Sequence, residues 1–313
     1  LFARALETPG GLKIQTIHAF CEALLHQFPL EANVPGKFSV MDDGQQQRLI
    51  EEARKRVIVD ADAHPGSPLG QSFISMMEVA TDGEIERALK NIVEQREELA
   101  EWLEQIGGPE GVGKQARHQF AYSANDTVAG LCEQAVKQSI FAIDDLRQMS
   151  NIGQSSPAAY DRNLAARIES FFLAKSPDDQ LAELAKIFLT STGGIRTYKG
   201  FAGKEVKAHF PDLEAMLEVE APRLIKAQRR VKTFCQIVET ERLMVVAEQV
   251  INQYRNDKRN RGLLDFDDLI NRTGDLLTRK DARAWVLYKL DLGIDHILLD
   301  EAQDTSPQQW QII

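Results

Sequence analysis

The stretch His296-Ile-Leu-Leu-Asp-Glu-Ala-Gln-Asp-Thr-Ser306 determines how the rest of this chain is interpreted. A short apolar run ends in two adjacent carboxylates, Asp300 and Glu301. This layout predicts a buried strand with both carboxylates at its carboxyl end, where open α/β sheets bind their ligands. Such a pair can hold Mg²⁺ and position a water molecule against a phosphate. A bare acidic pair before a helix needs no function, but Asp-Glu-x-Gln-Asp directly after an apolar strand is far more specific.

The residues around this stretch predict short helices. Ser306-Pro-Gln-Gln309 fits a capping box with proline at the first helical position. Upstream, Asp265 predicts the start of a helix with apolar residues at Phe266, Leu269, Ile270, Leu276 and Leu277, and a second short helix carries Trp285 and Tyr288. Asp265, Asp267 and Asp268 also allow a metal site, but Asp265 with Asp268 three residues later fits a helix cap better. We therefore expect these three aspartates to be structural.

The beginning of the chain predicts a strand followed by a helix. Leu12–Thr16 alternates apolar and polar residues, as a short strand does. Thr16 can cap the following helix, whose apolar residues lie on one face: Ile17, Phe20, Leu24, Leu25 and Phe28. Phe38–Met41 is a second short strand by the same reasoning.

Between these flanks the apolar residues recur almost entirely with helical spacing. The pattern predicts a chain that is mainly α, with a partial α/β domain interrupted by a large helical insert. We place the boundaries at 1–40 and 262–313 for the α/β part and 41–261 for the insert.

The composition limits the partners of the chain. It has 313 residues, which suggests about two domains, and a net charge of −10 from 37 basic and 47 acidic residues. Such an acidic chain is not a general polyanion binder, so any contact with nucleic acid needs a local basic patch. Cys21, Cys132 and Cys235 lie far apart without metal-binding spacing and indicate reduced thiols in the cytoplasm. No apolar run is long enough for a membrane span, and no signal peptide is visible.

Two segments have such basic patches. Residues 193–207 carry Arg196, Lys199, Lys204 and Lys207 against one acid, with Tyr198 and Phe201 between them, which is the composition of a flexible DNA-contact loop. The second patch comprises Arg255, Lys258, Arg259 and Arg261. A solvated surface explains either patch equally simply.

Four segments together resemble superfamily 1 DNA helicases of the UvrD/Rep type. Asp300–Ser306 is similar to the Walker B motif, Thr16–Cys21 to the Thr-Phe-His-Ser-Phe element on the single-strand path, and Gly262–Ile270 to the run that re-enters the first motor domain. Phe38–Asp42 is similar to the segment that opens the helical 1B insert. All four occur in the order of the family, and Thr-Ile-His with the Thr-Ser-Pro-Gln-Gln-Trp ending favours the AddA/RecB branch, AddA most closely.

The resemblance implies a P-loop NTPase (RecA-like) motor domain 1A in the two flanks and domain 1B between them. It implies an ATP-dependent 3′-to-5′ DNA helicase and nuclease subunit that works with an AddB-like subunit on broken DNA ends in repair and recombination. ATP and Mg²⁺ are the implied cofactors of the intact enzyme. Asp300 would hold Mg²⁺, Glu301 would act on the attacking water, and Gln303 would sense the nucleotide. Thr16 and His18 would contact the DNA strand, for which Thr16 and the N–H groups of the first helical turn suit a backbone phosphate.

A P-loop is not found in the sequence. Gly108–Lys114 has its spacing, but Gln115 follows the lysine where Ser or Thr is required, and Trp102–Ile106 before it predicts a helix, not a strand. The chain begins with Leu1, and we expect a fragment of a longer protein that is inactive as an ATPase alone.

Two alternatives stay open at this point. In the first, the insert is a non-catalytic helical module that binds DNA or a partner protein. In the second, the aspartates at 265, 267, 268 and 300 form a metal-dependent nuclease site.

Overall fold

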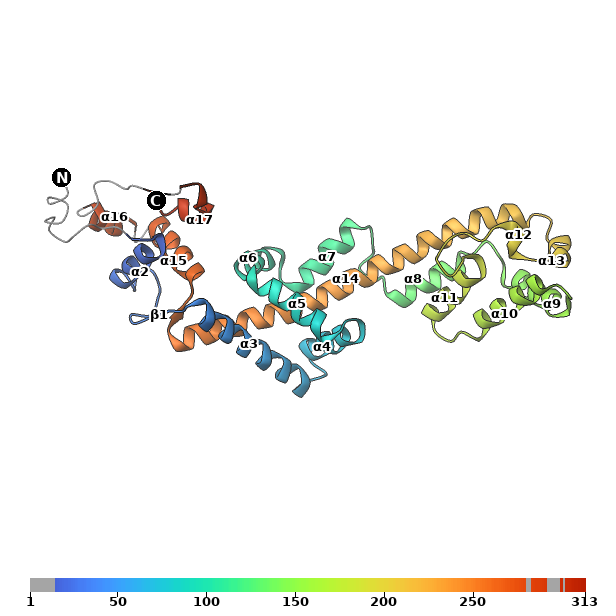
Figure 1. Ribbon diagram of the computed structural model, residues 1–313, viewed down its shortest axis with the longest axis horizontal. Coiled ribbons are helices and arrows are strands. Elements are labelled where there is room, and N and C mark those ends of the chain that lie inside the picture. The colour runs from blue at the N-terminus through green and yellow to red at the C-terminus, as the bar shows by residue number, and fades with distance from the viewer. Residues whose placement is uncertain (1–14, 280–282, 292–298, 301) are drawn as a thin grey trace. The chain divides into compact units, whose positions relative to one another are not determined.

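The computed structural model describes residues 15–279, 283–291, 299–300 and 302–313. These residues are mostly helical and include a two-stranded parallel sheet (Figure 1). The expected mainly α class is therefore confirmed, whereas the RecA-like fold stays a prediction. The predicted strands at Leu12–Thr16 and His296–Leu299 lie largely outside the described residues.

The chain forms two compact units. We call residues 1–73, 86–96 and 246–313 the flank unit, and residues 74–85 and 97–245 the helical unit. The flank unit thus includes residues that the sequence pattern placed in the insert, and the boundaries at 40 and 262 remain a prediction. The elements up to residue 119 are α2 (Ile17–Gln27), β1 (Ser39–Val40), α3 (Asp43–Ala63), α4 (Pro68–Val79), α5 (Asp82–Glu94), α6 (Arg96–Ile106) and α7 (Pro109–Gln119).

The remaining elements complete the helical unit and return to the flank unit. They are α8 (Val128–Lys137), α9 (Ile143–Ser155), α10 (Ala159–Leu173), α11 (Pro177–Phe188), α12 (Tyr198–Phe201), α13 (Lys204–His209), α14 (Leu213–Arg261), β2 (Leu263–Leu264), α15 (Phe266–Thr278), α16 (Arg283–Asp291), the 3₁₀ turn Ala302–Asp304 and α17 (Pro307–Trp310).

The parallel sheet joins segments that are far apart in the sequence. Ser39 is paired with Leu263 and Val40 with Leu264. The Ser39 N–H donates to the Gly262 carbonyl at 3.0 Å, and the Met41 N–H donates to the Leu264 carbonyl at 2.8 Å. Each strand ends at an aspartate that caps the next helix through a capping box, Asp42 for α3 and Asp265 for α15. The chain therefore makes the same strand-to-helix turn twice, side by side.

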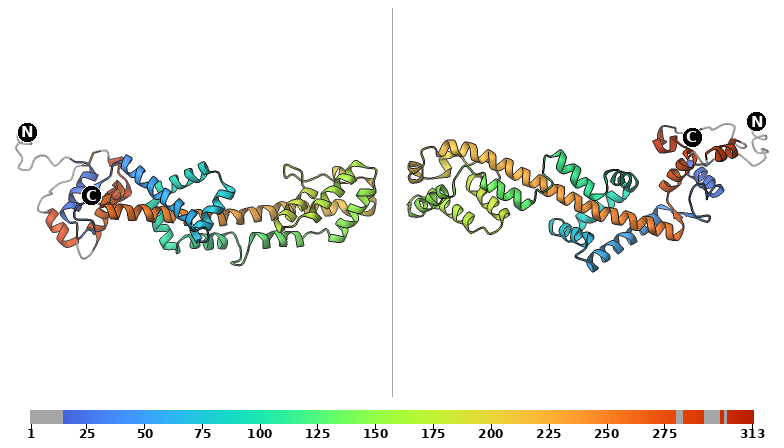
Figure 2. Two further views of the ribbon diagram at one scale, coloured as in Figure 1. Left: turned by 90° about the horizontal axis from the view of Figure 1, so that it is seen from below. Right: turned by 180° about the vertical axis from the view of Figure 1, so that it is seen from behind.

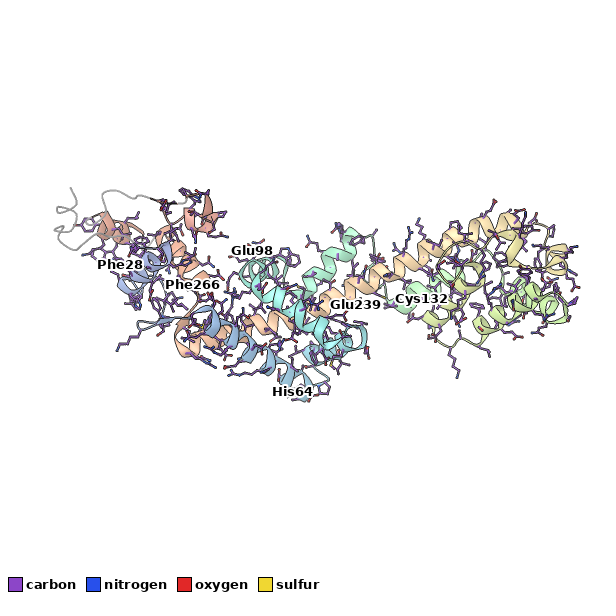
Figure 3. The ribbon with its side chains drawn as sticks, in the orientation of Figure 1. Phe28, His64, Glu98, Cys132, Glu239 and Phe266 are labelled. Carbon is purple, nitrogen blue, oxygen red and sulfur yellow. The ribbon has the colours of Figure 1, made fainter. Side chains whose placement is uncertain are left out.

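Helices α2 and α15 form the core of the flank unit (Figure 2). Thr16 caps α2, as its sequence predicts, by accepting a hydrogen bond from the Ala19 N–H at 3.2 Å. Figure 3 labels Phe28, which directly follows α2, and Phe266, the first residue of α15. The buried apolar residues of this core are Cys21, Leu24, Leu25, Phe28, Ala32, Val34, Phe38, Leu264, Leu269, Ile270, Leu276, Val286 and Ile312.

The helical unit has a separate core of its own. Helices α8 to α13 contribute to it together with the first part of α14, and Phe188 stacks on Phe201 with ring centroids 5.7 Å apart. Its fully buried side chains include Met149, Leu164, Ile168, Leu184, Ile187, Phe188 and Phe201.

Helix α14 is 49 residues long and continues through Pro222. It ends at Gly262, whose backbone has φ +63°, and the chain there turns directly into β2. No helix in the described ranges is both long and apolar enough to cross a membrane.

We predict that Gly262→Ala lowers the free energy of unfolding by about 1 kcal/mol, because an L side chain is strained at positive φ. The position has room for a methyl group, since the nearest atom to an added Cβ is the Lys37 carbonyl oxygen at 3.5 Å, so the cost is in the backbone. Chemical denaturation measures it.

Gly274→Ala is the matched control. Gly274 lies inside α15 with nothing within 4 Å of an added Cβ, so alanine should raise the stability by about 0.5 kcal/mol through helix propensity. Equal destabilisation by both substitutions would contradict this account of the turn.

Candidate functional site

The residues from Asp300 to Ile312 form the carboxyl-terminal part of the flank unit, and we call Asp300 with Glu301 the acidic turn. Asp300 is exposed in a bend, and Gln303 is exposed in the following 3₁₀ turn. The Ser306 hydroxyl accepts a hydrogen bond from the Gln309 N–H at 3.2 Å, which caps α17 as its sequence predicts. Ile312 is buried in the core beside α15, so the chain after the turn is held on that core. Glu301 lies outside the described residues.

Thr16 and His18 lie at the amino-terminal end of α2. Thr16 is exposed, and its hydroxyl serves as the cap. The His18 ring is half-buried and meets the Phe266 ring edge-on, with centroids 5.1 Å apart. His18 therefore packs against α15, which the sequence had not indicated. The two residues share the flank unit with Asp300 and Gln303.

A network of buried charges lies where β2 meets α15. Asp265 is fully buried, and one of its carboxylate oxygens, Oδ2, accepts hydrogen bonds from three side chains. The donors are Lys258 Nζ at 2.7 Å, Tyr254 Oη at 2.7 Å and Arg96 Nη2 at 3.0 Å. The other oxygen, Oδ1, accepts from the Asp268 N–H at 2.9 Å and so caps α15. The bond from Asp268 thus caps α15, and the other three bonds join the start of α15 to α14 and to the start of α6.

Burial and neighbouring charges shift the pKa values of groups in this network. Burial would raise the pKa of Asp265, but the charges of Lys258 and Arg96 outweigh burial and hold that pKa below its ordinary value. Burial and the Asp265 charge raise the pKa of Tyr254, so its hydroxyl stays a donor. For Asp268, burial and the adjacent Asp265 charge move the pKa upward. Lys258 contacts both aspartates, with Asp268 Oδ2 at 2.6 Å.

The sequence predicted the cap at Asp265 correctly but missed its cations. Lys258 is only 5% exposed and is paired with Asp265 and Asp268, so both alternatives left open for it, a DNA contact or a solvated surface cation, are wrong. Tyr254 lies one helical turn before Lys258, and this spacing is the signal that could have linked the two. Arg96 is 169 residues from Asp265 in the sequence, and no local pattern could have found it.

The basic segment at 193–207 belongs to the helical unit. It is not a flexible loop as expected, because it forms α12 and α13 and its residues Phe201 and Val206 are fully buried. Lys199 and Lys204 are exposed, and Arg196 is half-buried. The structure therefore places Arg196, Lys199 and Lys204 on one ordered segment, in a different unit from Thr16, His18 and Asp300.

The segment with P-loop spacing is a helix. Pro109 begins α7 after Gly108, a helix precedes it, and Lys114 Nζ pairs with Glu110 one turn earlier at 3.2 Å. In the ranges that the structure describes, no three His, Cys, Asp or Glu side chains lie close enough together to hold a metal ion. Asp265, Asp267 and Asp268 are instead bonded to Arg96 and Lys258.

We predict that Lys258→Met lowers the free energy of unfolding by about 3 kcal/mol, because it leaves the buried Asp265 with one cation in place of two. Asp267→Asn is the matched control. Asp267 contacts the same Arg96, but its side chain is 58% exposed, so its loss should cost less than about 1 kcal/mol. Equal losses for the two variants, measured by urea denaturation, would show that the buried position of Asp265 is unimportant.

The network also predicts how stability depends on pH. Because the folded-state pKa of Asp265 is lowered, its ionised form adds stability that is fully present above the ordinary carboxyl pKa of about 4 and is lost as the pH falls toward the folded value. Denaturation between neutral pH and about pH 3 should show this loss in the unmodified chain and in Asp267→Asn. Asp265→Asn should be less stable at neutral pH and lose less on acidification. An unchanged slope in Asp265→Asn would contradict the assignment.

Comparison with known proteins places this arrangement in a family. The model of the UvrD/REP helicase N-terminal domain matches residues 84–313. The chain is 23% identical to the AddA protein of the ATP-dependent helicase/nuclease of Limosilactobacillus fermentum over 95% of this chain and 24% of that protein. It is 22% identical to the protein of the same name from Staphylococcus carnosus over 96% of this chain and 26% of that protein.

A shorter match is closer in sequence. The RecB protein of the RecBCD enzyme of Mycolicibacterium smegmatis is 40% identical over 67 residues, which is 21% of this chain and 6% of that protein. The chain spans about a quarter of the length of the two AddA proteins. Because the family model covers well over half of its residues, the chain belongs to the UvrD/REP helicase family.

Proposed function

We propose that this chain is part of the motor of an ATP-dependent DNA helicase and nuclease of the AddA type. The flank unit would belong to a RecA-like motor domain, and the helical unit to its 1B insert. The family match and the names of the two relatives that align with nearly the whole chain support this proposal.

The observation that carries the proposal is the parallel pairing of β1 with β2, together with the packing of α2 on α15. These contacts unite the segment with Thr16 and the segment with Asp300 in one unit, although more than two hundred residues separate the two segments in the sequence. A split nucleotide-dependent motor requires this connection, because its motifs come from both sides of the insert. A simple helical binding module does not require it.

Asp300 and Glu301 would perform the phosphate chemistry. Asp300 is an exposed carboxylate after the apolar run, the type of oxygen ligand that Mg²⁺ takes. Bound Mg²⁺ would neutralise charge on the phosphates of ATP. Glu301 would orient the attacking water and accept its proton, and Gln303 would sense the nucleotide.

The DNA contacts would come from both units. In the flank unit, Thr16 and the first-turn N–H groups of α2 suit a backbone phosphate, and His18 lies beside them. In the helical unit, Lys199 and Lys204 are exposed cations, and Arg196 lies on the same segment. The parent enzyme would translocate 3′ to 5′, work with an AddB-like partner, and serve DNA repair and recombination in the cytoplasm.

We predict that the 313-residue chain alone does not turn over ATP, with or without single-stranded DNA, because it contains no Gly-x-x-x-x-Gly-Lys-Ser/Thr. In a longer enzyme that carries this segment, Glu301→Gln should lower the ATP hydrolysis rate by about 10²- to 10⁴-fold, because the base is lost while nucleotide binding is kept. Asp267→Asn should leave that rate unchanged. Full activity of Glu301→Gln in a steady-state phosphate-release assay would refute the assigned role.

A further inference from the structure

Two arginines of the helical unit, Arg167 and Arg196, form a pair that the proposed function does not explain. Arg167 lies in the middle of α10, and Arg196 lies in the turn that joins α11 to α12. Helix α10 packs against both α11 and α12. The Arg196 side chain reaches α11, the helix that packs on α10, because its Nη2 donates to the Lys186 carbonyl oxygen. Burial and the charge of Arg196 together lower the pKa of Arg167 to about 10.

This pair has no acidic partner among the described residues. Neither arginine forms an ion pair there, and the Nε–H of each is buried without a hydrogen-bond acceptor. The side-chain hydrogen bond that Arg196 does make is long, from its Nη2 to the Lys186 carbonyl oxygen at 3.4 Å. Buried donors on charged groups are costly when they lack acceptors.

Two acids on the same helices already have partners. Glu169 on α10 accepts a hydrogen bond from Gln154, and Glu183 on α11 pairs with Lys186 at 2.6 Å. A bound anion would supply the counter-charge that the described residues do not. Guanidinium groups suit an anion with several oxygens, because each presents a planar fork of N–H donors.

The segment that carries Arg196 is held firmly in place. Leu189 and Ile195 form an antiparallel bridge, and the Arg196 N–H donates to the Phe188 carbonyl at 3.2 Å. Further along, the fully buried Asp161 of α10 accepts hydrogen bonds from the Ser156 hydroxyl and the Gly203 N–H. The backbone that carries Arg196 is therefore fixed before any ligand arrives, which favours binding.

We propose that Arg167 and Arg196 together bind one backbone phosphate of a nucleic acid strand. The same segment supplies a track for further phosphates, because Lys199 and Lys204 are exposed. Lys207 Nζ lies 4.4 Å from the centre of the Tyr198 ring. The proposal rests on the proposed DNA contact of this segment. It adds a phosphate site and a residue, Arg167, that lies outside the basic segment of the sequence.

The experiment measures binding of a fluorescent single-stranded oligonucleotide to the full chain, by anisotropy over a series of salt concentrations. The variants Arg167→Met and Arg196→Met keep the apolar stem of the side chain and remove its charge. Each should weaken binding by roughly tenfold at low salt. Each should also lower the slope of log K against log salt by about 0.7, the value for one lost phosphate contact on a single strand. The double variant should lose little more than either single one, because both arginines hold the same phosphate.

Arg162→Met is the matched control on the same helix. Arg162 donates to the Ser156 and Pro157 carbonyls at 3.1 and 2.5 Å, so its charge is already engaged within the protein. Its loss should leave oligonucleotide affinity unchanged within about twofold.

Thermal unfolding without DNA distinguishes a role of Arg167 in binding from a role in stability. Arg167→Met should unfold at the same or a higher temperature than the unmodified chain, because it relieves the repulsion by Arg196, whereas a structural arginine would lower that temperature.

Two further measurements distinguish the sources of the anion. Inorganic phosphate and an oligonucleotide with an uncharged methylphosphonate backbone are tested against the same variants. Competition by free phosphate at millimolar concentration, with no difference between the charged and uncharged oligonucleotides, would overturn the nucleic acid assignment in favour of a small-anion site. Normal affinity and salt slope in both arginine variants would overturn the phosphate site. If Lys199→Glu with Lys204→Glu still abolishes binding in that case, the proposed DNA contact of the segment survives. If the unmodified chain binds no oligonucleotide at all, the proposed DNA contact fails as well.

Discussion

The buried carboxylate of Asp265 is the interaction on which the flank unit depends. It lies directly after β2, caps α15, and accepts hydrogen bonds from Arg96, Tyr254 and Lys258. Burying this charge would be strongly unfavourable without the two cations, so the carboxylate is stable only when three separate segments of the chain come together. The network therefore joins the end of α14, the start of α6 and the turn into α15 through hydrogen bonds and ion pairs.

The Asp265 network also fixes where the end of α14 returns the chain to the flank unit. Lys258 lies in the last turn of α14, and β2 pairs with β1 immediately afterwards. The 49-residue helix thus returns the chain to a fixed register beside the segment that leads from α2. Because α15 also supports Val286 and Ile312 in its core, the position of the acidic turn depends on the register set at Asp265.

The helical unit contains buried acids that have hydrogen-bond partners and two arginines that have no acidic partner in the part of the chain that the structure describes. Its buried acids, Asp161 and Glu220, are satisfied by hydroxyls, backbone N–H groups or Arg223, and these bonds fix its turns. The arginines at 167 and 196 are the opposite case, since their charges have no counter-charge in the described residues. A protein of net charge −10 that keeps two such cations together concentrates its attraction for an anion at one place.

Local patterns in the sequence determined the parts of this protein that depend on local physics. Thr16, Asp265 and Ser306 cap their helices as predicted, and Phe38–Met41 contains a strand, because caps and strand alternation involve residues two or three positions apart. Only the tertiary structure decided that Lys258 is a buried counter-ion rather than a DNA contact, that Phe201 is core, and that Arg167 lies beside Arg196. Those outcomes depend on which distant side chains share a buried space, and the low polarity of that space, absent from any local pattern, decides whether a charge must be paired.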